Sequence, residues 1–292
     1  MSDKAKKKTK GKFWLILLYI LLALVIAAGL FYVYIEYHAR HFDTVFYQVG
    51  SSQVSENLRI IFITDLHMRE YGEGNSELLS KVKILDPDLI IIGGDLVTYP
   101  DTNYDNMIEF CRKLMTIAPV YSVTGNHENE LMYLAGDSGL IEKFSETGMV
   151  FLDNADVTLE IGSNKVQLVG VNGGVDSFDK YGGKEEMDSL EEHFDGLRIV
   201  IDHVPYAFEK NLAAYDFDLG LAGHVHGGII RLPKFGGLYS FDEGLFPTYT
   251  KGKYYLENGA ELIVSAGLGD SFKYPIRFNN NPELSVIDIN WY

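Results

Sequence analysis

Five short blocks of carboxylate, imidazole and amide side chains each follow a predicted β-strand. They are Asp65-Leu66-His67, Gly93-Gly94-Asp95, Gly125-Asn126-His127-Glu128, His203-Val204-Pro205 and Gly223-His224-Val225-His226-Gly227-Gly228. Ligand sites in open α/β sheets lie outside the carboxyl ends of the strands, so we expect the five blocks to converge. In an extended chain, residues i and i+2 point to the same side. That spacing would aim Asp65 with His67, and His224 with His226, at one place.

Taken singly, each block is a weak signal, although Gly125-Asn126-His127-Glu128 and Gly223-His224-x-His226 are hard to explain by packing. A lone Asp-x-His is usually a capped turn, Gly-Gly-Asp a tight turn, and an isolated His203 a satisfied core histidine. Together the blocks favour a catalytic or metal-binding site, because five of the eight histidines fall inside them. The other three, His38, His41 and His193, fit structural roles. Oxygen and imidazole donors without thiolates suit Mn²⁺, Fe, Zn²⁺ or Co²⁺.

Apolar runs and helical stripes alternate along the chain and supply the elements that must position these blocks. Runs typical of strands cover 58–64, 88–92, 119–124, 156–161, 165–171, 197–201, 217–222, 253–257, 261–265 and 284–289. Helical patterns cover 76–85, 104–116, 139–147, 185–194 and a region near 206–214. Such alternation predicts βαβ units and a mostly parallel sheet, so we interpret 58–292 as one α/β domain.

The N-terminus predicts a membrane helix. Residues 13–35 contain no charged side chain, and a helix of that length spans roughly 35 Å, against about 30 Å for a bilayer core. The tail, residues 1–12, holds six lysines and one acid, which favours a cytoplasmic tail and an extracytoplasmic body. A cleavable signal peptide ending near Ala27-Ala28-Gly29 is the alternative to an uncleaved signal anchor. Residues 36–57 are interpreted as a juxtamembrane connector.

Composition narrows the classes of function. The chain of 292 residues carries 25 basic and 41 acidic side chains, a net charge of −16. Because the basic tail contributes +5, the rest of the chain carries −21. An acidic body lacks the basic footprint of a nucleic-acid-binding protein. Cys111 is the single cysteine, which excludes an intrachain disulfide framework and a Cys-rich zinc site.

Together, the five blocks resemble the signature motifs of the calcineurin-like metallophosphoesterases, and the resemblance covers about 58–292. Three further patterns resemble a membrane-associated or exported bacterial phosphodiesterase-like subgroup: Gly267-Leu268-Gly269, Pro275-x-Arg277-Phe278 and Pro282-Glu283. The resemblance implies an α/β fold with two packed mixed β-sheets flanked by helices, a four-layer sandwich. One N-terminal transmembrane helix would precede it.

The resemblance also implies a site for two divalent metal ions. The matched positions assign Asp65, His67 and His226 to one metal, Asn126, His203 and His224 to the other, and Asp95 to both. His127 would stand beside the metals as a proton donor or transition-state stabiliser. A metal-bridging hydroxide would then attack phosphorus in line. Mn²⁺ is the favoured ion, with Zn²⁺, Fe and Co²⁺ as alternatives.

Some positions depart from the pattern or add to it. Leu96-Val97-Thr98-Tyr99 stands where the phosphoprotein phosphatases usually carry an Asp-Arg pair, which argues against a protein phosphatase. Glu128 would either orient His127 or a metal ligand, or cap the strand end. Arg69 would contact a substrate phosphate or lie on the surface. Asp202 would tune the metal or cap its strand.

An aromatic, glycine-rich stretch lies between the fifth block and the 253–265 hairpin. It would form an apolar substrate surface facing lipid, or simply pack on the domain. Its aromatic residues are Phe235, Tyr239, Phe241, Phe246, Tyr249, Tyr254 and Tyr255.

The leading interpretation is a membrane-anchored, dimetal-dependent phosphohydrolase, with a phosphodiesterase preferred over a monoesterase. The substrate would be a phosphodiester, either soluble, lipid-linked or part of the cell envelope. The alternatives are a phosphomonoesterase, a non-catalytic metal-binding or interaction module on the same fold, and a metal-sensing membrane protein. We expect a single-pass protein of the cell membrane with an extracytoplasmic catalytic domain, and assign no oligomeric state.

Overall fold

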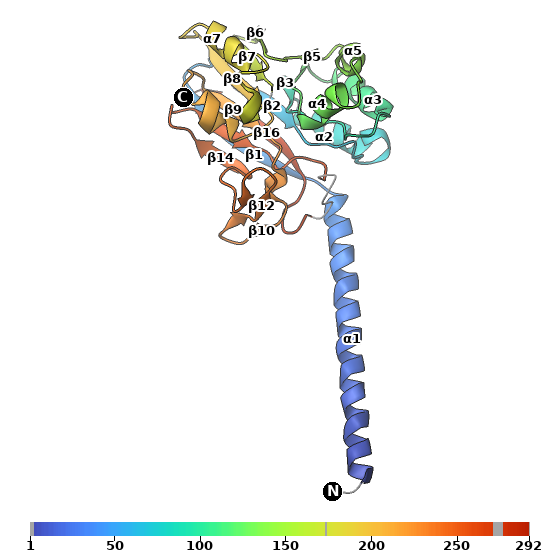
Figure 1. Cartoon of the computed structure of the whole chain (residues 1–292). Coiled ribbons are helices and arrows are strands. Elements are labelled where there is room, and N and C mark those ends of the chain that lie inside the picture. Colours follow the sequence, from blue (N-terminus) through green and yellow to red (C-terminus); the bar gives the residue numbers. More distant parts are fainter. Residues whose placement is uncertain (1–2, 173, 271–276, 292) are drawn as a thin grey trace.

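A long N-terminal helix projects from a folded α/β domain (Figure 1). The computed structural model describes residues 3–172, 174–270 and 277–291. Helix α1 (Asp3–Ala39) takes in the apolar run and most of the basic tail. Its segment Lys12–His38 is long and apolar enough to cross a membrane, and it is exposed except near its C-terminal end, which is partly covered by the domain. Such an exposed apolar helix lacks the buried face of a core helix.

The domain contains two six-stranded sheets. The first has the strand order β1-β16-β2-β3-β4-β5. Its strands are β1 (Asp43–Ser51), β16 (Glu283–Trp291), β2 (Leu58–Ile63), β3 (Leu89–Ile92), β4 (Val120–Ser122) and β5 (Val150–Phe151). Strands β2 to β5 are parallel, and β16 joins them antiparallel.

The second sheet has the order β14-β15-β9-β8-β7-β6. Its strands are β14 (Gly252–Tyr255), β15 (Glu261–Val264), β9 (Leu219–Ala222), β8 (Leu197–Asp202), β7 (Asn164–Val171) and β6 (Ala155–Ile161). The four central strands are parallel, while β14 and β6 pair antiparallel at the edges. Both sheets are therefore mixed, with parallel strands at their centres.

Each sheet is buried on both faces, which explains the continuous apolar runs of its central strands. Alternate residues of β3 illustrate the division: Leu89 and Ile91 face the core between the sheets, while Ile90 and Ile92 face an outer core. Helices cover the outer face of the first sheet, namely α2 (Ser76–Leu85), α3 (Asp105–Leu114), α4 (Asn126–Tyr133) and α5 (Leu140–Ser145). The expected four-layer α/β sandwich is confirmed.

The second sheet is covered by α6 (Gly174–Ser177), α7 (Gly183–Ser189) and the helical turn Phe208–Leu212. Beyond β9 the chain forms two small two-stranded sheets. Their strands are β10 (Arg231–Leu232), β11 (Gly236–Gly237), β12 (Tyr239–Ser240) and β13 (Gly244–Leu245).

Two segments differ from the sequence expectation. Within the expected connector 36–57, α1 continues to Ala39 and β1 forms a nine-residue edge strand paired with β16. The helix expected over 185–194 ends at Ser189, because Leu190 turns to an extended conformation and packs against the outer core of the second sheet.

Candidate metal centre

The five blocks converge at the carboxyl ends of five parallel strands. The first three follow β2, β3 and β4 of one sheet, and the other two follow β8 and β9 of the second. Because both sheets present this edge to the same place, His67 and His226 meet although they lie 159 positions apart in sequence. The convergence that the sequence predicts is therefore found in the structure.

The backbone reason for this convergence differs from the expected one. Asp65 and His67 do not extend a strand: they have left-handed φ values of 52° and 49°. His224 and His226 likewise have φ values of 70° and 46°. Each pair lies in a tight turn beyond its strand, so the extended-chain argument was wrong. Asp65 and His67 still reach one donor group, whereas His224 and His226 belong to two different groups.

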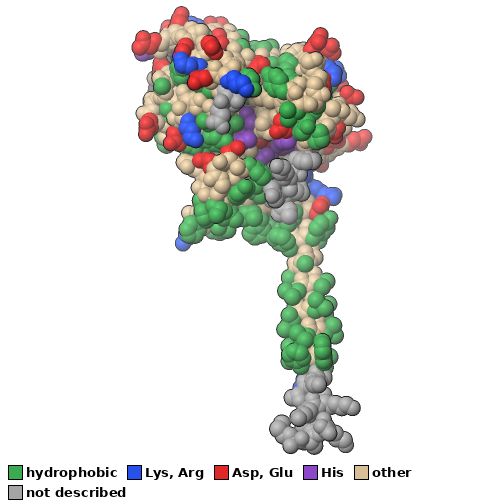
Figure 2. Space-filling view, viewed as in Figure 1, with side chains coloured by type: hydrophobic (Ala, Val, Ile, Leu, Met, Phe, Trp, Pro, Cys, Tyr) green, Lys and Arg blue, Asp and Glu red, His purple; other side chains and the backbone are tan. Residues whose placement is uncertain are grey.

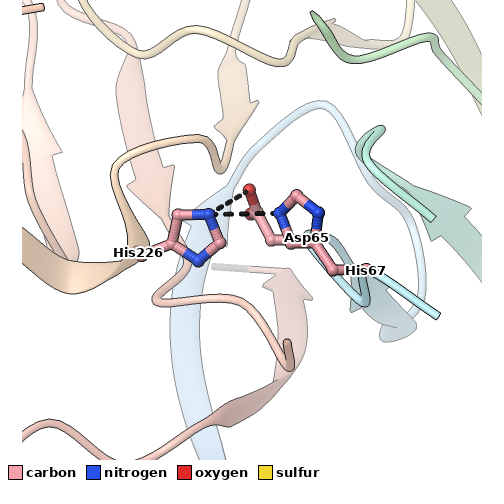
Figure 3. A group of neighbouring side chains, drawn as sticks. All are labelled: Asp65, His67 and His226. Atoms are coloured by element: carbon pink, nitrogen blue, oxygen red, sulfur yellow. Dashed lines mark hydrogen bonds and ion pairs between the residues drawn. The ribbon is translucent and has the colours of Figure 1, made fainter. Parts of the chain in front are cut away.

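Asp65, His67 and His226 form the first donor group (Figure 3). Nε2 of His67 lies 3.2 Å from Nε2 of His226, and Oδ1 of Asp65 lies 3.7 Å from the latter atom. Two imidazole nitrogens that face one another beside a buried carboxylate are better explained as ligands of one cation than as a hydrogen-bonded pair.

Asp95, His203 and His224 form the second group. Nε2 of His203 lies 3.2 Å from Oδ2 of Asp95 and, although buried, has no hydrogen-bond partner among the described residues. Nδ1 of His203 donates a hydrogen bond to the carbonyl of Gly93 at 2.7 Å. The other ring nitrogen, Nε2, therefore remains available as a ligand for a cation. Asn126 joins this group through its Oδ1, 3.0 Å from Nδ1 of His224.

Asp95 stands between the two groups. Its Oδ2 lies 3.7 Å from Nε2 of His67 and 3.2 Å from Nε2 of His203. Burial raises the pKa of this carboxyl, but the charge and hydrogen bond of His203, together with the neighbouring imidazoles of His67 and His127, hold the pKa well below its ordinary range. A buried carboxylate reaching both groups is the part that two cations would share.

Burial lowers the pKa of His67 to about 4, and it also lowers the pKa of His226 well below its ordinary value. Both rings are therefore neutral and keep a nitrogen lone pair for a cation at neutral pH. His203 differs: burial lowers its pKa, but the carboxylates of Asp95 and Asp65 prevail and raise it to about 10. A cation between those carboxylates would take the place of that ring proton.

Glu128 holds the loop that presents Asp95. Its buried carboxylate accepts hydrogen bonds from the backbone N–H groups of Gly125, Asp95 and Leu96, each at 2.8 Å. Burial and the charge of Asp95 raise its pKa. Of the two roles open for Glu128, capping of the strand ends is the one its contacts support.

His127 lies beside the first group, its ring 4.8 Å from that of His67 between centroids. The backbone N–H of Tyr99 donates to Nδ1 of His127 at 3.0 Å. The neutral ring must then carry its proton on Nε2. The backbone N–H of His127 separately donates to Oδ1 of Asp95 at 2.9 Å.

Two glycines allow these turns to pack closely. A Cβ at Gly125 would overlap the carboxylate of Asp95, and a Cβ at Gly223 would overlap that of Asp65 and the hydroxyl of Thr64. The glycines of the motifs therefore give the backbone access to the two carboxylates.

Arginine side chains flank the first group. Arg69 pairs with Asp270, so it does not lie alone on the surface. The buried guanidinium of Arg277 lies 3.2 Å from Nδ1 of His226. A cation bound at Nε2 of His226 would leave the ring proton on Nδ1. Because a guanidinium can only donate hydrogen bonds, Arg277 would then face another N–H donor and would have to turn away. Pro275 of the same predicted pattern lies outside the described residues.

Asp202 caps its strand end: Oδ1 accepts from the N–H of Val204 at 2.8 Å. Its other oxygen has no partner among the described residues, and burial raises the pKa of Asp202 to about 7.

Asp242 is a residue that the sequence motifs missed. It lies between β12 and β13 and pairs with Nε2 of His224, which leaves Nδ1 of that ring toward Asn126. Carboxylates commonly orient metal-bound histidines in this way. The spacing of the blocks gave no signal for it, because Asp242 stands in a loop of aromatic and glycine residues.

A cavity of about 290 Å³ adjoins the second group and shares Asn126 and His203 with it. Its outer wall is largely apolar, with Tyr133, Leu134 and Tyr181, and the two tyrosine rings stack at 6.2 Å. The amides of Asn129 and Asn172, 2.8 Å apart, supply polar groups. The centre therefore has adjacent room for the organic part of a substrate.

Comparison with known proteins gives one family. The sequence model of the calcineurin-like phosphoesterases matches residues 58–228. The uncharacterized metallophosphoesterase YkuE of Bacillus subtilis is 27% identical over 97% of this chain and 98% of its own. Phosphodiesterase YaeI of Escherichia coli is 26% identical over 80% of this chain and 84% of its own. Among solved structures, TT1561 of Thermus thermophilus aligns with a TM-score of 0.45 and 16% identity, covering 72% of this chain and 90% of its own.

Proposed function

The chain belongs to the calcineurin-like phosphoesterase family, and from that premise we propose that it is a membrane-anchored phosphodiesterase that works with two divalent cations. The observation that carries the proposal is the buried carboxylate of Asp95, reached on one side by His67 and on the other by His203. Each side has further donors, so the chain offers two adjoining cation sites.

We assign the residues as follows. Asp65, His67 and His226 would hold one cation, Asn126, His203 and His224 the other, and Asp95 would bind both. When bound, the two cations supply Lewis-acid polarisation of the phosphoryl group and a water of lowered pKa. Mn²⁺ is the ion we favour for this mixed imidazole and carboxylate set.

His127 supplies a hydrogen-bond donor at the same place. Since Tyr99 donates to its Nδ1, the Nε2–H group remains for a phosphoryl oxygen or for the leaving oxygen. That tautomer suits a proton donor and does not suit a metal ligand through Nε2. The backbone N–H of His127 donates to Asp95, so the backbone that bears the ring lies beside the centre.

The adjoining cavity supports a diester in preference to a monoester. A diester carries a second organic group, and the wall formed by Tyr133, Leu134 and Tyr181 offers it an apolar surface. The name of the relative YaeI, a phosphodiesterase, points the same way.

Anchoring rests on α1. Its apolar segment would cross the bilayer and stay uncleaved, the lysines of residues 1–12 would remain in the cytoplasm, and residues 43–292 would lie outside. A lipid-linked or cell-envelope phosphodiester is then the accessible substrate class.

The test is hydrolysis of bis-p-nitrophenyl phosphate by the full chain in detergent, after removal of metal with a chelator and return of Mn²⁺. We expect activity to return with Mn²⁺ and to exceed that on p-nitrophenyl phosphate. The variant His127→Ala should keep Mn²⁺ binding but lose about 10²–10⁴-fold in kcat/KM. Mn²⁺ binding with no turnover of either ester would contradict the proposal and favour a metal-sensing or interaction module.

A further inference from the structure

Exposed apolar side chains concentrate on the segment that holds β10 to β13. We call this the underside surface and define it by Phe235, Tyr239, Leu245 and Phe246. Phe235, Leu245 and Phe246 are 74%, 67% and 55% exposed. Figure 2 shows hydrophobic side chains gathered along the edge of the domain from which α1 leaves, and Figure 1 places β10 and β12 beside that end of α1.

Part of the aromatic stretch behaves differently. Tyr249 and Tyr254 pack against the outer core of the second sheet, and their rings meet at 5.1 Å. Packing on the domain therefore explains these two residues but leaves the underside surface open. A group of large apolar side chains facing water on a folded domain usually marks an interaction site.

The underside surface is held at a fixed level relative to α1. The ring of Phe278 packs against Phe31 and Tyr34 of α1, at 5.8 and 5.7 Å between centroids. The carbonyl of Phe278 in turn accepts from the N–H of Arg231, the first residue of β10. The surface thus begins where the apolar part of α1 ends.

We propose that the underside surface docks on the lipid bilayer that α1 crosses. The proposal rests on the membrane anchoring stated above. A helix leaving a membrane ends at the interfacial layer, where aromatic side chains are favoured. The surface joined to that helix end presents Phe235, Tyr239 and Phe246 at the same level, and the bilayer is the apolar phase within their reach.

The charge of the domain decides how the docking works. The chain beyond residue 12 carries −21, so anionic lipid headgroups would repel it. Docking must therefore come from burial of the phenylalanine and leucine side chains in the interfacial layer. Binding should depend little on salt.

Docking would place the metal centre beside the membrane. Asp242, between β12 and β13, pairs with His224, and Phe241 lines a small pocket together with His224 and His226. The hairpin that bears Leu245 thus also forms a wall of the centre. The substrate class that follows is a phosphoester whose headgroup lies at the bilayer surface.

The test uses the full chain in phosphatidylcholine vesicles with a nitroxide on a single introduced cysteine. Leu245→Cys probes the underside surface, and Leu134→Cys, directly after α4, is the matched control, since Leu134 is 69% exposed. The native Cys111 is buried and should not label. We expect molecular oxygen, which enters the bilayer, to speed relaxation of the nitroxide at 245, and water-soluble chromium oxalate to have little effect on it. Chromium oxalate should speed relaxation of the nitroxide at 134.

Equal access of chromium oxalate to both labels would overturn the proposal. Dipolar broadening between labels at 245 would also overturn it, because a second copy of the chain would then cover the surface. Neither outcome depends on catalysis.

A second measurement concerns substrate class. The double variant Phe235→Ser with Phe246→Ser should keep turnover of bis-p-nitrophenyl phosphate and lose turnover of a phospholipid diester in the vesicles. The variant Ile84→Ser, at an exposed site on α2, should keep both. Unchanged lipid turnover in the double variant would contradict the inferred substrate class. Absence of any diester turnover in the native chain would instead count against the proposed function.

Discussion

Five of the seven residues assigned to the cations have positive backbone φ. Asp95, at 52°, joins Asp65, His67, His224 and His226 in this left-handed region. Each such residue costs about 1 kcal/mol or more relative to an ordinary conformation. The buried strands before these turns keep the backbone of the turns in place, which would favour binding of cations by the side chains they bear.

At the scale of residues, the sequence predicts which residues gather at the site better than it predicts their backbone conformations. The residue types and their order, with the family resemblance, predict eight candidate residues that the structure brings together, while their roles stay a prediction. The left-handed turns could not be predicted, since none of the five residues is glycine. Asp242 was missed because its partner, His224, lies 18 positions away and no short motif joins them.

Glu128 gives a prediction about positioning. In the native chain, backbone N–H groups donate to both carboxylate oxygens of Glu128. In Glu128→Gln, the amide NH₂ would replace one of these acceptors with a donor, so the Asp95 loop should shift. We expect Mn²⁺ affinity to fall about tenfold or more, because the capped loop that presents Asp95 would move. Calorimetric titration with Mn²⁺ measures this. Glu142→Gln, at an exposed position of α5, is the control and should bind as the native chain does.

Asp218 gives a prediction about pH that is independent of the centre. Burial raises its pKa, and its Oδ2 accepts from the N–H of Arg198 at 2.7 Å. The folded state then binds more protons than the unfolded state above the ordinary aspartate pKa, so this group lowers stability as pH rises.

Asp218→Asn removes that titration and keeps an acceptor for Arg198. The variant should therefore become more stable relative to the native chain, with a larger free energy of unfolding, as the pH rises from about 4, near the ordinary aspartate pKa, to about 7. Urea unfolding followed by circular dichroism at both pH values measures the difference. A difference that is independent of pH would show that Asp218 titrates normally.

At the scale of elements, the parallel strands and the helices between them were predictable, because each has a continuous apolar run or a helical stripe. Strand β1 was not, because it is an edge strand whose burial alternates and whose sequence is half polar. Its partner β16 lies at the other end of the chain. Local pattern carries no information about a pairing of that separation.

Tyr47 tests whether β1 is an integral strand. Its hydroxyl donates to Oε1 of Glu283 at 2.7 Å, and Glu283 is fully buried. Tyr47→Phe should lower the free energy of unfolding by about 1–3 kcal/mol, because a buried carboxylate loses a donor. Chemical unfolding measures this. Tyr255→Phe on the exposed part of β14 should change stability by less than about 0.5 kcal/mol, and an equal effect of both would contradict the role of β1.

At the scale of the whole molecule, the two sheets determine where the donor groups meet, and helix α1 determines where the domain is attached. The sheets bring loops from both halves of the chain to one edge, where neither half alone supplies both donor groups. The second half supplies His203, His224 and His226, and the first supplies the carboxylates, His67 and Asn126. On the proposed anchoring, helix α1 and the underside surface would set where that edge lies relative to a membrane.

The central claim is that the two halves build one centre for two cations with Asp95 between them. The most direct measurement is electron paramagnetic resonance of the full chain loaded with Mn²⁺, with metal content determined on the same sample. We predict two Mn²⁺ per chain, in agreement with a two-metal site, and a spectrum of exchange-coupled ions that Asp95→Asn abolishes. A single bound ion, or two ions with uncoupled spectra in the native chain, would contradict the account.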